Sequence, residues 1–269
     1  MASRWTLETE EVYRKELQNL YTAKNLSIAE IGKFLGIAES TVFRRLKRLG
    51  IKTSPKEKKG YLDLLKKIHI PSTRTDTLAE FFGIMLGDGH ISKYQTVVTL
   101  GTKELAYVDY VAELMDSLFH TSPSTIVRAD GYRDVYIGSV ELTTWLQGSG
   151  LVPNKVASQV SAPEWLFKQN SFLEAFLRGF FDTDGSVYAL RYGVQISLTN
   201  HSVPLLHSLR SMLIALEYRP SRVSGYRVYL TRKKDVSRFF AEVRPANTKH
   251  LTRFNKFKRR WRSGKRTRL

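Results

Sequence analysis

Two stretches of the chain repeat one pattern, an apolar helical run that ends in a carboxylate beside a glycine. They are "FFGIMLGDG" at 81–89 and "LRGFFDTDG" at 177–185, and their acids, Asp88 and Asp184, are 184 − 88 = 96 residues apart. After each acid the pattern predicts two strands, a helix, two more strands and a last helix. The repeat therefore predicts an α+β fold of two halves, each helix, two strands, helix, two strands, helix, related by a pseudo-twofold axis.

Small residues on the two motif helices predict that these helices pack closely. They recur at every fourth position, as Ala79, Gly83 and Gly87 on the first helix and Ala175, Gly179 and Thr183 on the second. Residues at this spacing share one helix face, so backbones can approach there. Capping boxes are expected at Thr77–Glu80 and Ser171–Glu174, which places the acids at the carboxyl ends of the helices.

Packing of these helices would bring the two acids together in an unfavourable place. Each carboxylate opposes its helix dipole, and a pair separated by about 4 Å repels by about 4 kcal/mol at an effective dielectric of about 20. We therefore expect a cation between Asp88 and Asp184. A plain helix stop is the alternative for a single Gly-Asp-Gly, but two occurrences at equivalent positions favour a metal site.

Composition limits the metal and the partner. The chain has no cysteine, so a metal must be held by oxygen or imidazole, and Mg²⁺ is the first choice, with Mn²⁺ or Ca²⁺ as substitutes. The 43 Lys and Arg against 25 Asp and Glu leave a net charge of +18, which favours nucleic acid as the partner. The absence of cysteine also favours an intracellular protein. No apolar run reaches the ~18 residues of a spanning helix, so we expect no membrane partner.

The two repeated segments resemble the paired signature motifs of single-chain LAGLIDADG homing endonucleases, over roughly residues 77–260. The resemblance implies two halves that form a DNA-binding saddle, with Asp88 and Asp184 as metal ligands. Gly87 and Thr183, which precede the acids, are assigned with them to the metal site, and Gly83 and Gly179 to helix packing. Leu86 departs from the family pattern; the second motif has Asp182 there, which we interpret as a local helix-end polar residue.

The resemblance also implies one basic residue per half near the metal. Lys155 follows Asp88 by 155 − 88 = 67 residues and Lys249 follows Asp184 by 249 − 184 = 65, so both are assigned as catalytic. The implied activity is metal-dependent double-strand cleavage at a long asymmetric DNA site by a monomer that uses no small-molecule substrate. The alternative is a non-cleaving DNA-binding regulator or an intron RNA splicing helper on the same scaffold.

Alternating strands predict one polar sheet face in each half. Arg and Gln can pair bidentately with guanine and adenine, so such a face can read a major groove, although a merely solvated face is the alternative. The candidate DNA-binding residues are Gln95, Arg128 and Arg133 in the first half and Arg191, Gln195 and Arg227 in the second.

The amino-terminal region predicts a helix-turn-helix over residues 26–51, with a generic helical hairpin as the alternative. Its candidate DNA-binding residues are Ser40, Thr41, Arg44, Arg45 and Arg48. The expected domains are 1–51 for this module, 52–76 for a basic linker, 77–161 for the first half and 162–269 for the second. The second half ends in a basic tail, since residues 244–269 hold 11 Lys or Arg and no acid.

Overall fold

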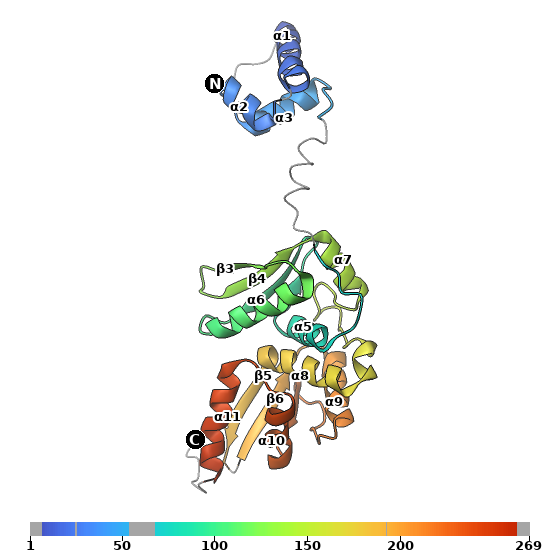
Figure 1. Ribbon diagram of the computed structural model, residues 1–269, viewed down its shortest axis with the longest axis vertical. Coiled ribbons are helices and arrows are strands. Elements are labelled where there is room, and N and C mark those ends of the chain that lie inside the picture. The colour runs from blue at the N-terminus through green and yellow to red at the C-terminus, as the bar shows by residue number, and fades with distance from the viewer. Residues whose placement is uncertain (1–6, 25, 54–67, 192, 263–269) are drawn as a thin grey trace. The chain divides into compact units, whose positions relative to one another are not determined.

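The computed structural model describes residues 7–24, 26–53, 68–191 and 193–262 and divides the chain into two compact units, Met1–Lys66 and Lys67–Leu269 (Figure 1). Each unit has a hydrophobic core of its own. Residues 54–67 of the expected basic linker and the end of the basic tail at 263–269 lie outside the described residues. Within the described ranges, no helix has the length and apolar character needed to cross a bilayer.

The first unit is a small helical bundle. Its helices are α1 (Leu7–Gln18), continued by the π-helical turn η1 (Asn19–Ala23), then α2 (Ile28–Leu35) and α3 (Glu39–Arg48). A capping box starts α2, because the Glu30 amide donates to Ser27 Oγ at 3.2 Å and the Ser27 amide donates to Glu30 Oε2 at 2.8 Å. Gly36 ends α2 with φ of +66°, which permits the tight turn into α3.

The first half of the second unit has the predicted order of elements. They are α5 (Asp76–Gly87), β1 (Gly89–Ile91), β2 (Gln95–Leu100), α6 (Leu105–Phe119), β3 (Ser124–Val127), β4 (Arg133–Gly138) and α7 (Val140–Gly148). The antiparallel sheet has the strand order β1-β2-β4-β3. On β2 and β4 one face is buried, through Val98, Leu100, Val135 and Ile137, whereas the edge strand β3 is exposed on both faces.

The second half repeats this arrangement with one strand fewer. After the 3₁₀ turn η2 (Glu164–Lys168) come α8 (Asn170–Asp184), β5 (Gly185–Leu190), β6 (Gly193–Thr199), α9 (Val203–Ala215), β7 (Arg227–Leu230), α10 (Lys233–Glu242) and α11 (Thr248–Arg262). The sheet order is β5-β6-β7. The prediction of a fourth strand here is wrong: residues 219–224 contact β7 through the bond from the Ser221 amide to the Tyr229 carbonyl and one isolated bridge. Pro220 offers no amide for a ladder.

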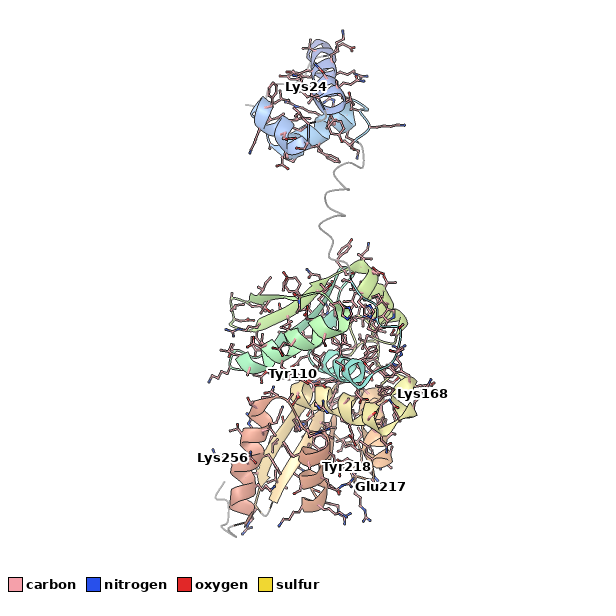
Figure 2. The ribbon with its side chains drawn as sticks, viewed as in Figure 1. Lys24, Tyr110, Lys168, Glu217, Tyr218 and Lys256 are labelled. Atoms are coloured by element: carbon pink, nitrogen blue, oxygen red, sulfur yellow. The ribbon has the colours of Figure 1, made fainter. Side chains whose placement is uncertain are left out.

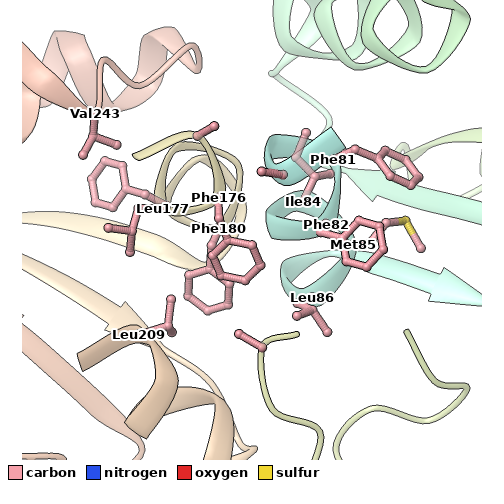
Figure 3. Packing of buried hydrophobic residues seen from close by; sticks show 14 of the residues in the cluster. Phe81, Phe82, Ile84, Met85, Leu86, Phe176, Leu177, Phe180, Leu209 and Val243 are labelled. Carbon is pink, nitrogen blue, oxygen red and sulfur yellow. The ribbon is translucent and has the colours of Figure 1, made fainter. Parts of the chain in front are cut away.

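Helices α5 and α8 lie side by side in the middle of the second unit, with one sheet on either side (Figure 1). In Figure 3, Phe81 and Met85 of α5 point toward the first half, and Leu177 of α8 points toward the second. At the contact itself, a Cβ atom on Gly83 would lie 2.2 Å from the carbonyl oxygen of Phe176. The predicted close packing of the two motif helices is therefore confirmed.

The predicted capping boxes of these two helices are wrong. Helix α5 starts two residues earlier than expected, with Thr75 Oγ1 accepting from the Leu78 amide at 3.1 Å. Helix α8 begins at Asn170, and no side chain caps it. Glu80 instead turns into the contact between the halves, where it accepts hydrogen bonds from Tyr110 and Arg178. These tertiary hydrogen bonds, and not a capping role at the start of α5, therefore determine the conformation of Glu80.

Helix α11 adds a basic element to the outside of the second half. Phe254 is buried and stacks on Phe240 of α10, with ring centroids 3.9 Å apart. On the opposite side, Arg253 and Lys256 are exposed, and Lys256 points away from the sheet in Figure 2. The helix therefore packs through Phe254 and leaves Arg253 and Lys256 at the surface.

Candidate functional site

The seam between α5 and α8 brings the two acids of the repeat to the same place. Asp184 is the last residue of α8, and Asp88 directly follows α5. A Cβ atom on Gly87 would lie 3.7 Å from the Asp184 amide nitrogen. The buried Asn200 amide links the two helix ends, because it donates to Asp184 Oδ2 at 3.0 Å and lies 3.5 Å from the Leu86 carbonyl oxygen.

Both acids have raised pKa values, as expected for two carboxylates that share one buried site. Burial first, and then repulsion from Asp184, raise the pKa of Asp88 to about 6, while Lys155 and Lys249 act in the opposite direction. Burial also raises the pKa of Asp184, opposed by Lys155, the Asn200 hydrogen bond and Lys249. Negative charge here is therefore only partly compensated by the protein.

Lys155 lies in the loop after α7 and reaches into this site. Its ammonium donates to the carbonyl oxygens of Met85 at 3.2 Å and Gly89 at 3.0 Å, and also to that of Gly87. Burial lowers the pKa of Lys155, while Asp184 and Asp88 act to raise it. The ammonium thus neutralises the negative end of the α5 dipole while it faces both acids.

The second lysine enters from the other half. Lys249, near the start of α11, forms an ion pair with Glu104, with Nζ 2.5 Å from Oε1. Glu104 precedes α6 in the first half, and its charge also raises the pKa of Asp88. The two predicted lysines and two predicted acids thus converge. Glu104 and Asn200 join them, although no local sequence pattern indicated either.

The donor set suits a hard cation that keeps most of its water. In the described part of the chain, no group of three or more His, Asp or Glu side chains is placed to hold a metal ion. A metal would use the two carboxylates together with backbone oxygens, water and phosphate, which is how Mg²⁺ is usually bound. The other two predicted ligands already have hydrogen-bond partners. The Gly87 carbonyl accepts from the Lys155 ammonium, and the Thr183 hydroxyl donates to the Gly179 and Phe180 carbonyls.

Asp182 is not the local helix-end residue that the sequence predicted. Its side chain is fully buried and accepts hydrogen bonds from the backbone amides of Ala246 and Asn247. Burial raises its pKa to about 7, opposed by these two bonds. Its partners are more than 60 residues away, beyond the reach of any local pattern.

The open face of the second sheet carries the predicted polar residues. The strand register pairs Tyr188 with Gln195 and Thr199 with Arg227 on this face, and between them Ser197, which is buried, with Tyr229. The other face holds the buried Val194, Ile196, Leu198, Val228 and Leu230. Arg191 is exposed in the turn after β5. The predicted alternation of this half is confirmed.

The first sheet differs from prediction at one arginine. Gln95 is exposed on β2, and Arg128 is exposed just after β3, where its guanidinium lies 3.9 Å from Asp134. Arg133 pairs with Leu100, on the same side of the sheet as buried Val135, and donates to the Thr102 carbonyl at 3.1 Å. The expectation that Arg133 shares the open face is wrong, because it alternates onto the same side of β4 as Val135 and Ile137, which are buried.

In the first unit, α3 presents a basic outer face. Ser40, Arg44 and Arg48 are exposed and four residues apart, and Arg44 Nε donates to the Ser40 carbonyl at 3.2 Å. Thr41 and Arg45 are half-buried, with the Arg45 guanidinium 5.1 Å from the centre of the Tyr13 ring. Three of the five predicted residues therefore lie on one exposed helix face.

Solved structures resemble this chain only distantly. Mesophilic variants of the homing endonuclease I-DmoI share 17% identity, with a TM-score of 0.46, over 62% of this chain and 94% of that one. The amino-terminal LAGLIDADG domain of DUF199/WhiA shares 18% identity, with a TM-score of 0.46, over 65% of this chain and 86% of that one. I-DmoI has also been solved with DNA together with calcium or manganese.

Curated relatives match over a small part of their own length. The replication factor C small subunit of Methanocaldococcus jannaschii is 31% identical over 117 residues, which are 43% of this chain and 6% of that protein. The glutamine–fructose-6-phosphate aminotransferase of the same organism is 26% identical over 194 residues, 70% of this chain and 17% of that protein. Because these names are unrelated and the shared parts small, neither named activity transfers to this chain.

A family model matches the second half. Residues 171–244, from the start of α8 to the end of α10, match the model of the LAGLIDADG-like domain. The matched range contains Asp184 and the whole β5-β6-β7 sheet. Together with the repeated α+β architecture, this match assigns the fold: the chain contains a LAGLIDADG-like domain.

Proposed function

We propose that this protein is a metal-dependent endonuclease that hydrolyses phosphodiester bonds in both strands of DNA. One observation carries the proposal: Asp88 and Asp184, one from each half, converge at the end of a glycine-lined helix contact with Lys155 and Lys249 beside them. A pseudo-twofold pair of acids suits two antiparallel strands, each with one scissile phosphate.

The chain's own residues have distinct roles in this proposal. Asp88 and Asp184 hold the divalent ion with their carboxylate oxygens. When bound, such an ion supplies Lewis acidity toward a phosphate oxygen and lowers the pKa of bound water. Lys155 and Lys249 orient water and offset the negative charge that develops on the phosphate. No side chain acts as the nucleophile.

The open sheet faces support an asymmetric target. Exposed or half-exposed residues on the second face include Tyr188, Gln195, Arg227 and Tyr229, whereas the first face offers His90, Gln95 and Tyr136 at comparable places. Because hydrogen-bonding groups on the two faces differ, the halves would read different bases. In this proposal, the outer face of α3 and the basic α11 add contacts to phosphates.

The experiment is cleavage of a randomised DNA library by the full chain with Mg²⁺ or Mn²⁺, and with a chelator. We expect double-strand breaks at one sequence that require the metal. Asp88→Asn and Asp184→Asn should abolish cleavage while DNA binding persists; Asp116→Asn, on the exposed surface of α6, is the matched control. Sequence-specific binding by the unaltered chain without cleavage in either metal would contradict the nuclease proposal and support the non-cleaving regulator.

A further inference from the structure

The buried carboxylate of Asp182 ties the end of α8 to the segment that precedes α11. Its Oδ2 accepts from the Ala246 amide at 2.8 Å, and its Oδ1 accepts from the Asn247 amide at 3.1 Å. The Asn247 side chain returns a bond to the Asp182 carbonyl at 3.1 Å. Both residues are almost completely buried, at 0% and 1% exposure, so water cannot replace these bonds.

The same network continues to the backbone of Lys249. Asn247 Oδ1 accepts from the Lys249 amide at 3.2 Å, and the Asn247 carbonyl accepts from the His250 amide at 3.1 Å. His250 is fully buried, with its ring packed on Phe181 at a centroid distance of 4.4 Å. Asp182 therefore fixes the backbone from which the Lys249 side chain leaves.

At its other end, the Lys249 ammonium meets charges from both halves. Its Nζ lies 2.5 Å from Glu104 of the first half, and its charge also acts on Asp88 and Asp184. Holding the ammonium in one place costs side-chain rotamer entropy, and a backbone that is already fixed adds no further entropy cost to it.

The first half has no such clamp. Leu86 stands where the second half has Asp182, and it is buried among apolar residues. Lys155 is held instead at its ammonium, by the carbonyl oxygens of Met85, Gly87 and Gly89. The two lysines of the site are therefore positioned by different means.

We propose that Asp182 is a positioning residue: by fixing residues 246–249, it places the Lys249 ammonium in the site between the halves. The expected effect of Asp182 on cleavage rests on the proposed nuclease function. Its expected effect on the Lys249–Glu104 ion pair does not. Two independent measurements therefore test it.

The first measurement is the coupling between Lys249 and Glu104 in urea unfolding of the full chain. With Asp182 present, Lys249→Met and Glu104→Gln together should lower the midpoint by less than the sum of their separate shifts. In Asp182→Asn the shifts should become additive. Asn247→Ala leaves Asp182 its two backbone donors but removes the hydrogen bond to the Lys249 amide, so it should also make the two shifts additive. This variant replaces Asp182→Asn if the latter folds poorly. Coupling that persists unchanged in these backgrounds would overturn the proposal.

The second measurement follows each DNA strand separately with end labels. Asp182→Asn should slow the strand that Lys249→Met slows, by roughly 10- to 100-fold, and leave the other within about twofold. The double variant should be no slower on that strand than Lys249→Met alone. Asp235→Asn, which alters another buried acid whose partner is the Arg219 amide, controls for lost stability and should leave the strand ratio unchanged.

Two results would distinguish a failure of the Asp182 proposal from a failure of the nuclease proposal. Equal slowing of both strands by Asp182→Asn, or a further loss in the Lys249→Met background, would show that Asp182 does not act through Lys249. If the unaltered chain cuts no DNA with either metal, the nuclease proposal fails, while the coupling measurement still decides whether Asp182 places the lysine.

Discussion

Gly83 of α5 and Gly179 of α8 contact each other's helix in the same way. A Cβ atom on Gly83 would lie 2.2 Å from the Phe176 carbonyl oxygen, and one on Gly179 would lie 2.1 Å from the Glu80 carbonyl oxygen. The reciprocal distances express the pseudo-twofold relation of the two halves. Because the obstacle on both sides is backbone, a larger residue cannot be accommodated by a change of rotamer.

The first prediction concerns this seam. Gly83→Ala or Gly179→Ala should destabilise the second unit by about 3 kcal/mol or more, since the two helices must separate to admit the methyl group. Gly148→Ala, at the end of α7 with no atom within 4 Å of the new Cβ, should change stability by less than about 1 kcal/mol. Urea unfolding measures both. Equal effects of the seam and control substitutions would contradict the close approach.

A second prediction concerns the ion pair across the seam. Arg178 donates to Glu80 Oε2 at 2.9 Å and to the Val243 carbonyl at 2.8 Å, and Glu80 is almost completely buried. Arg178→Leu should destabilise by about 3–5 kcal/mol, because it leaves a buried carboxylate with Tyr110 as its remaining partner. Glu80→Leu with Arg178→Leu should cost less than the sum of the single changes. Additive losses in this double-mutant cycle would show that the two side chains are not coupled.

The sequence predicted those features that depend on local periodicity. The 96-residue repeat predicted two similar halves, and small residues at every fourth position predicted the α5–α8 contact. The alternation of β6 and β7 predicted the open and buried faces of the second sheet. The helix and strand patterns each lie within one element, and the repeat is a comparison of two stretches of the chain, so all three can be read without knowing the tertiary partners.

The errors came from features that depend on tertiary contacts or on a strand's first residue. Glu104 and Lys249 are 249 − 104 = 145 residues apart, and Asp182 and Asn247 are 65 apart, so no local pattern indicates either pair. Arg133, the first residue of β4, was placed on the wrong face, although its alternation with the buried Val135 and Ile137 puts it on the core side. Such contacts follow from how the two halves meet, which the repeat predicts in general but not residue by residue.

A third prediction uses the raised pKa of Asp88, about 6 against an ordinary 3.8. The native state then binds more protons than the unfolded state between these values, so the charged carboxylate costs stability as pH rises through 6. Without divalent ions, Asp88→Asn should be more stable than the unaltered chain by about 1–3 kcal/mol at pH 8 and nearly equal at pH 4. Added Mn²⁺ should stabilise only the unaltered chain. A stability difference that does not change with pH would contradict the burial of charge.

The fourth prediction concerns the first unit. Arg44 is exposed on α3, so if this helix contacts DNA, Arg44→Gln should weaken binding and reduce the slope of log affinity against log salt by about 1. Lys24→Gln, outside α3, is the charge-matched control. Binding isotherms at several salt concentrations give both slopes. An unchanged slope in Arg44→Gln would show that this face makes no phosphate contact there.

The last prediction concerns His250, which lies in the first turn of α11 and is fully buried. Burial lowers its pKa to about 3, the nearby charge of Lys249 acts in the same direction, and a contact with the Asp182 carbonyl opposes them. The unfolded state therefore binds the extra proton between pH 6.5 and 3, and stability falls as pH is lowered through this range. His250→Leu removes this proton uptake, so relative to the variant the unaltered chain should lose about 2–3 kcal/mol between pH 7 and pH 4.5. His207→Leu, which removes an exposed imidazole on α9, controls for the loss of one titratable group. Parallel pH profiles for the unaltered chain and His250→Leu would mean that the imidazole is reached by water.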